Sequence, residues 1–171
     1  AVIIWRRFGF RAALLFDFFL GAIPCTMEYA VQIRMYSWAI FFITFMGLWA
    51  YEAYAEERWL YFAGVAATSV AAAYTHYFAF VSAILIYGFL FLSLLFTPGK
   101  RRRLIEWFVS VVVSLILYLP WMPYMKIQVK GVSRNYWIEE ITGETVKDFF
   151  PFLFDMDIPW TTVIWMFILV V

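Results

Sequence analysis

The sequence contains one cysteine and one histidine, and this scarcity excludes two common kinds of site. Cys25 alone cannot form an internal disulfide framework or a cysteine cluster for a metal, and His76 alone cannot form a histidine-rich metal site. The sequence also lacks a glycine-rich phosphate loop, a nucleophile elbow and any motif with metal-ligand spacing. Any chemistry must therefore be sought in scattered residues that the fold brings together.

Charged residues are few and apolar residues are abundant. Lys, Arg, Asp and Glu make up 15% of the 171 residues, whereas 65% are hydrophobic and 23% are aromatic. The mean hydropathy is +0.81. Because an ordinary soluble domain is about 45–50% apolar, we predict a polytopic membrane protein that binds membrane lipids and no nucleic acid.

The apolar runs predict an all-α transmembrane helix bundle. A membrane helix needs about 20 largely apolar residues, which gives about five complete spans and two partial ones. The complete spans are predicted at 12–29, 36–54, 59–75, 78–96 and 104–121, and the partial ones at 1–5 and from Trp160 onward. The chain starts without Met and ends inside an apolar run, so we expect residues 1–171 to be a single transmembrane domain that is a fragment of a longer protein.

The links between spans differ in charge, which predicts their side of the membrane. Loops 6–11, 52–58 and 97–103 share one side, and the positive-inside rule makes it cytoplasmic because 6–11 and 97–103 are rich in Arg and Lys. The run Lys100–Arg103 is expected to meet anionic headgroups. The outer side then carries the polar residues 28–36, the turn at His76 and the long polar segment 124–158.

The segment 124–158 is predicted to be an outer-face loop with one short interfacial helix. Pro120 and Pro123 lie just before it and are expected to bend or end the fifth span, because proline removes a backbone hydrogen-bond donor. Residues 142–150 read as an amphipathic helix lying on the membrane, with Thr142 as its N-cap.

The stretch 28–37 is the most informative one for function, because ionisable residues at membrane depth are costly and mark working sites or interfaces. Glu28, Gln32 and Tyr36 are four apart and share a helix face. Arg34 can grip a phosphate bidentately, or it can reach headgroups or pair with Glu28. Glu28 can equally be a metal ligand, a hydroxyl acceptor or an ion-pair partner. Gln32 can hydrogen-bond a sugar hydroxyl.

Three further residues are candidates for substrate binding. His76, within Tyr74-Thr-His-Tyr-Phe78, either ties two helices together through hydrogen bonds or contacts a substrate. Tyr136 and Trp137 either stack on a sugar ring or anchor the chain at the membrane interface. A divalent metal cofactor is compatible with this composition, but no residue is assigned to it.

Four stretches in order resemble bacterial membrane glycosyltransferases of the GT-C superfamily, in the group related to protein O-mannosyltransferases and to the aminoarabinose transferase of lipid A. The stretches are Gln32-Ile-Arg-Met-Tyr-Ser37, Tyr74-Thr-His-Tyr-Phe78, Leu117-Tyr-Leu-Pro-Trp-Met-Pro123 and Tyr136-Trp-Ile138. The resemblance covers most of residues 5–140 and implies an integral, multi-pass protein of the bacterial plasma membrane, part of the cell envelope.

The resemblance also implies an activity. A sugar would move from a polyprenyl-phosphate carrier to a lipid, glycan or protein acceptor on the outer face, and Arg34 would correspond to the arginine of the family motif. The family's catalytic carboxylate lies in a loop expected upstream of residue 1, so no catalytic residue is named. The family commonly has Glu where this chain has Gln32, a departure that bears on activity. A transporter or flippase, or a non-catalytic membrane subunit, is the alternative.

Overall fold

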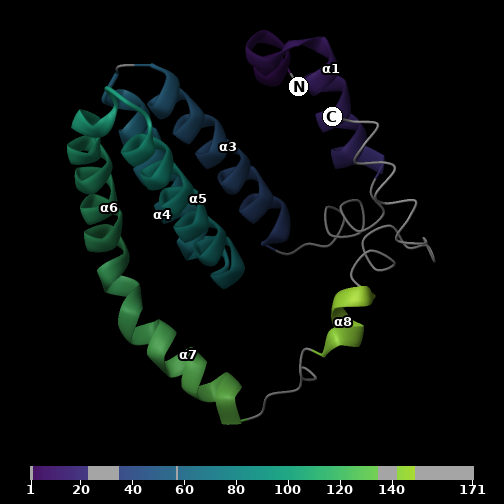
Figure 1. Cartoon of the computed structure of the whole chain (residues 1–171). Coiled ribbons are helices and arrows are strands. Elements are labelled where there is room, and N and C mark those ends of the chain that lie inside the picture. The colour runs from purple at the N-terminus through teal and green to yellow at the C-terminus, as the bar shows by residue number, and fades with distance from the viewer. Residues whose placement is uncertain (1, 23–34, 57, 135–141, 149–171) are drawn as a thin grey trace. The chain divides into compact units, whose positions relative to one another are not determined.

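A computed structural model describes residues 2–22, 35–56, 58–134 and 142–148 (Figure 1). These residues are helical apart from short turns, and no strand occurs among them, which confirms the all-α prediction for this part of the chain. The chain divides into two compact units, residues 35–136 on the one hand and residues 1–34 with 137–171 on the other.

Two helices in the described part of the chain are long and apolar enough to cross a membrane. They run over Tyr77–Phe96 and Arg101–Gly131, and the shorter helix Leu60–Thr75 is also apolar. The predicted number of spans and the predicted single domain remain predictions.

The unit 35–136 begins with three helices whose ends lie within one or two residues of the predicted spans. They are α3 (Tyr36–Ala55), α4 (Leu60–Thr75) and α5 (Tyr77–Phe96). The chain continues through the 3₁₀ turn η1 (Arg101–Arg103), α6 (Leu104–Tyr118), the 3₁₀ turn η2 (Leu119–Trp121) and α7 (Met122–Arg134). Hydropathy located these helices well because each apolar run is bounded by a polar or charged turn.

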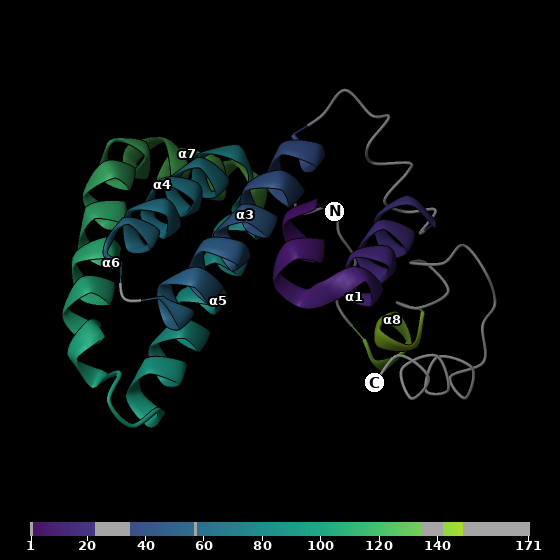
Figure 2. The same cartoon turned by 90° about the horizontal axis from the view of Figure 1, so that it is seen from above.

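Helix α4 is the centre of this unit. It packs against α3, α5 and α6, and Figure 2 shows it flanked by α3 and α6. Small residues permit this close packing: Ala66, Ala72 and Ala73 are buried, and a Cβ atom at Gly64 would lie only 2.8 Å from Trp49 Cδ2 of α3.

The links 56–59 and 97–103 meet at one end of the unit, here called the basic end. Lys100 Nζ donates a hydrogen bond to the Tyr54 carbonyl and lies over the Tyr54 ring. The Arg103 guanidinium is buried, donates to the Glu56 carbonyl and forms an ion pair of 2.8 Å with Glu106. Two of the four cations assigned to headgroups therefore hold the protein together, because the close helix ends supply carbonyl and carboxylate acceptors.

The structure differs from the prediction after residue 121. The segment 124–158 was predicted as a loop with one short helix, yet its residues up to Arg134 belong to α7. Pro120 lies in the first turn of η2 and Pro123 is the second residue of α7. Proline is tolerated in the first turn of a helix, where its missing N–H has no partner to lose. These prolines thus bend the helical path without ending it.

The other unit contributes two described helices. Helix α1 (Val2–Ala22) is interrupted at Gly9, whose φ of 86° and ψ of 171° are non-helical, so the predicted basic loop 6–11 is a sharp break within a helix. Helix α8 (Gly143–Lys147) lies within the stretch 142–150 that was predicted to be helical and is shorter than it. Its place at the membrane interface stays a prediction. Thr142 is its N-cap as predicted, since Thr142 Oγ1 accepts a hydrogen bond of 3.4 Å from the Thr145 amide.

Candidate functional site

The structure brings together two of the residues predicted to bind substrate. Tyr36 is the first residue of α3, and His76 is the single residue between α4 and α5. Their ring centroids lie 5.3 Å apart with an interplanar angle of 51°. The start of α3 and the α4–α5 turn therefore lie together at the end of the unit opposite the basic end.

His76 has a clear structural role in this position. Its backbone is extended, its amide donates to the Ala72 carbonyl at 3.1 Å, and its Nδ1 accepts a hydrogen bond of 3.1 Å from the Phe78 amide. His76 thus ends α4 and caps α5, which supports the interpretation that it ties two helices together. Because Nδ1 accepts, a neutral imidazole carries its proton on Nε2, which is the nitrogen that can donate to a further partner.

Helices α6 and α7 reach the same end through aromatic contacts. The Tyr74 hydroxyl donates to the Leu117 carbonyl at 2.9 Å, and the Tyr74 ring lies 5.6 Å from Trp121. The Tyr77 hydroxyl donates to Gln128 Oε1 of α7. We call this set the aromatic end; it comprises Tyr36, Tyr74, His76, Tyr77, Tyr118, Trp121 and Tyr124. These residues form a packed aromatic cluster at this end of the unit.

The other predicted site residues are outside the part of the chain that the structure describes. They are Glu28, Gln32, Arg34, Tyr136 and Trp137. Their predicted roles stay predictions, with Arg34 immediately before the described start of α3.

Sequence reasoning missed a set of hydroxyl groups in the interior of the helical unit. The Tyr87 hydroxyl of α5 lies 2.8 Å from Ser110 Oγ and 3.0 Å from Ser114 Oγ of α6. Ser114 Oγ also lies 2.9 Å from Ser69 Oγ of α4. We call these four residues the hydroxyl network. The spacing of Ser110 and Ser114, one helical turn apart in an apolar run, is the sequence signal that could have indicated a shared polar face.

Every member of the hydroxyl network also has a backbone partner or a second hydroxyl. The Ser110 hydroxyl can donate to the Phe62 carbonyl of α4, and those of Ser114 and Ser69 can donate to the Ser110 and Ala66 carbonyls of their own helices. Each hydroxyl has one proton, so these bonds alternate with the bonds between the hydroxyls. A hydrogen bond between helices in a membrane protein contributes about 0.6 kcal/mol on average and up to about 1.7 kcal/mol. The hydroxyl network therefore links α4, α5 and α6 by hydrogen bonds.

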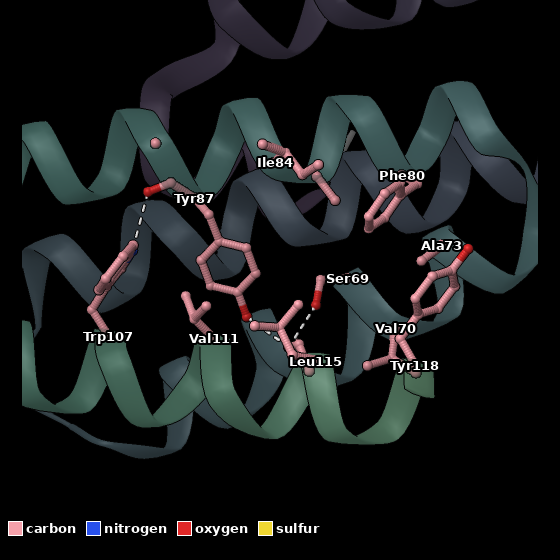
Figure 3. A pocket seen from close by; sticks show the side chains of 13 residues that line it. Ser69, Val70, Ala73, Phe80, Ile84, Tyr87, Trp107, Val111, Leu115 and Tyr118 are labelled. Carbon is pink, nitrogen blue, oxygen red and sulfur yellow. Dashed lines mark hydrogen bonds between the residues drawn. The ribbon is translucent and has the colours of Figure 1, made fainter. Parts of the chain in front are cut away.

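A cavity of about 320 Å³ lies beside this network, between α4, α5 and α6 (Figure 3). Figure 3 shows the Tyr87 side chain extending from α5 towards α6, with Trp107 Nε1 donating to the Tyr87 carbonyl at 3.0 Å. Apart from the hydroxyl groups its walls are apolar, so it suits a hydrocarbon group better than a polar ligand. The lining residues are Ser69, Val70, Ala73, Phe80, Ala83, Ile84, Tyr87, Gly88, Trp107, Val111, Ser114, Leu115 and Tyr118.

Among the residues described, no three His, Cys, Asp or Glu side chains are grouped closely enough to hold a metal ion. The compatibility with a divalent metal that the sequence suggested stays a prediction.

No family model, curated protein or solved structure matches this chain. The resemblance to the GT-C glycosyltransferases therefore rests on the four stretches quoted above.

Proposed function

We propose that this chain is part of a membrane glycosyltransferase that moves a sugar from a polyprenyl-phosphate carrier to an acceptor. The protein would be an integral, multi-pass protein of the bacterial plasma membrane, and the aromatic end would face the outside. Transfer would be an inverting displacement at the anomeric carbon, with the polyprenyl phosphate as the leaving group.

The convergence of three of the four stretches supports this proposal. Tyr36 belongs to the stretch 32–37, His76 to 74–78 and Trp121 to 117–123. Although far apart in the sequence, they are linked by the contact of Tyr36 with His76 and by the contact of Tyr74 with Trp121. A shared substrate site would account for this gathering.

Within this proposal Arg34 stabilises the charge that develops on the leaving phosphate, since a guanidinium can grip phosphate oxygens bidentately. Tyr36 and His76, whose rings are in contact, would contact the sugar or the phosphate. Glu28, Gln32, Tyr136 and Trp137 would complete the substrate site. The catalytic carboxylate is not assigned to any residue of this chain.

The test is Arg34→Ala in the full-length protein, assayed with a polyprenyl-phosphate sugar as donor. Loss of a charge-stabilising group of this kind lowers the rate by roughly 100-fold or more, and we expect that loss with normal membrane insertion. Arg102→Ala, at the basic end, is the matched control and should leave the rate unchanged. Unchanged turnover in Arg34→Ala would contradict the proposal.

The same preparation distinguishes the alternatives. A transporter or flippase would move the lipid-linked sugar across a proteoliposome without transferring it, and a non-catalytic subunit would do neither. If the wild-type protein transfers no sugar, the enzyme assignment is rejected, whether or not the protein moves the lipid-linked sugar across the membrane.

A further inference from the structure

Two hydrogen bonds join one face of helix α7 to the rest of its unit. Gln128 accepts a hydrogen bond from Tyr77 of α5, and Met125 Sδ accepts one of 3.6 Å from the Tyr118 hydroxyl. These two residues define the face of α7 that turns towards the neighbouring helices. In Figure 1, α7 continues beyond the ends of α4 and α5.

The opposite face of α7 is basic. At about 100° per residue, Lys126 and Lys130 each lie about 160° around the helix from Gln128, and they are one turn apart. Both are exposed. Arg134 follows Lys130 at the same spacing in the sequence, and no Asp or Glu occurs from Trp107 to Ile138. The helix therefore presents two lysines one turn apart, and the sequence continues this spacing with Arg134.

Apolar side chains border these lysines on both sides. Ile127 is 69% exposed and Val129 is 57% exposed. Exposed apolar residues beside lysines characterise helices that lie at a membrane surface, where the apolar groups enter the acyl boundary and the lysines reach headgroups. A site for a soluble phosphate would gain nothing from exposed isoleucine and valine.

The length of the helical path places α7 at the right depth. The path Arg101–Gly131 has 31 residues, which at 1.5 Å per residue is about 46 Å. The hydrocarbon core of a bilayer is only about 30 Å thick. If the apolar part of this path crosses the core, the lysines of α7 emerge at headgroup level.

We propose that α7 is a binding surface for anionic lipid headgroups, formed by Lys126 and Lys130 with Ile127 and Val129 entering the bilayer beside them. Each lysine near a negatively charged surface strengthens lipid binding by roughly fivefold. This proposal needs only that the apolar part of the path Arg101–Gly131 crosses a membrane, and it is independent of the glycosyltransferase proposal.

The test uses the full chain with Cys25→Ser and Ile127→Cys, labelled with the environment-sensitive dye NBD at position 127. The protein is placed in nanodiscs of phosphatidylcholine alone or of phosphatidylcholine with 30% phosphatidylglycerol. We expect a blue shift of NBD emission in the anionic discs, and its loss at 1 M salt, where the screening length falls to about 3 Å. Equal emission in both lipids would overturn the proposal.

Variants separate charge from folding. Lys126→Gln with Lys130→Gln should abolish the blue shift, whereas Lys126→Arg with Lys130→Arg should retain it, and Arg102→Gln at the basic end should leave it unchanged. Retention of the shift in the glutamine variant would show that other groups bind the lipid. Inorganic phosphate added to neutral discs should have no effect; a blue shift there would mean a soluble phosphate site and reject the lipid surface.

Discussion

The Tyr36 ring lies 5.3 Å from the imidazole of His76, and this contact joins the beginning of α3 to the turn between α4 and α5. Arg34, the residue proposed to bind phosphate, precedes Tyr36 by two positions. Through this pair, the stretch that carries the proposed phosphate ligand is connected to the stretch that carries the chain's histidine.

Two substitutions of His76 separate its structural role from a role in substrate binding. Asparagine can accept the Phe78 amide hydrogen bond as an N-cap, whereas alanine cannot, which costs about 1 kcal/mol. We expect His76→Asn to have the unfolding free energy of the wild type in detergent and to lose sugar transfer. We expect His76→Ala to be less stable by about 1 kcal/mol and to lose sugar transfer as well. Full transfer by His76→Asn would show that the ring serves only as a cap.

Gly64→Ala should destabilise the contact between α3 and α4. The added Cβ would lie 2.8 Å from Trp49 Cδ2 and 2.9 Å from Trp49 Cγ, atoms in the inner part of the indole that cannot move without the whole ring. Overpacking of this kind costs about 1–3 kcal/mol. Thermal unfolding followed by circular dichroism would measure it. Gly47→Ala is the control, because nothing lies within 4 Å of its Cβ position; equal stability of the two variants would refute the close approach.

Tyr87→Phe removes the hydroxyl that Ser110 and Ser114 share. Both serines keep their backbone acceptors, so we expect a modest loss of stability, about 0.5–1.5 kcal/mol. Tyr124→Phe, at an exposed tyrosine of the aromatic end, should cost less. The unfolding free energies of the two variants are compared with that of the wild type. An equal loss at both positions would show that the hydroxyl network does not stabilise the packing of these helices.

Arg103→Lys tests the basic end. The Arg103 guanidinium donates from Nε and Nη2 to Glu106 Oε2 at 3.0 and 2.8 Å and from Nη1 to the Glu56 carbonyl. A lysine keeps the charge but not this fork of donors, so we expect a loss of about 1–3 kcal/mol. Arg102→Lys, one residue earlier and exposed, should be neutral. If both substitutions behave alike in thermal unfolding, Arg103 is not a structural residue.

The sequence predicted the helices α3, α4 and α5 closely because hydropathy and turn residues agree there. It did not predict α7, because Pro120 and Pro123 are expected to bend or end the fifth span and the residues after them to form a loop. Only the fold shows that both prolines lie in first turns. The sequence also did not predict the burial of Arg103. Neighbouring arginines in one basic run have the same local sequence features, and only the packing of the helix ends determines which of them is buried.

The candidate site was predictable only in part. The pairing of Tyr36 with His76 follows from placing two polar stretches on the same side of the membrane. The hydroxyl network follows only in part, because the spacing of Ser110 and Ser114 indicates a shared face of α6 but nothing in the sequence pairs these serines with Ser69 or Tyr87. Which side of α4 and α6 faces α5 is determined by packing, and the apolar pattern of these helices is too uniform to show it.

The single residue between α4 and α5 has a mechanical consequence. Antiparallel helix pairs ordinarily use connections of about two to five residues, which leave slack for one helix to slide along the other. Here His76 alone ends one helix and caps the next. We therefore expect α4 and α5 to move together as one rigid unit. The longer links 56–59 and 97–100 would then be the hinges of any rearrangement of this unit.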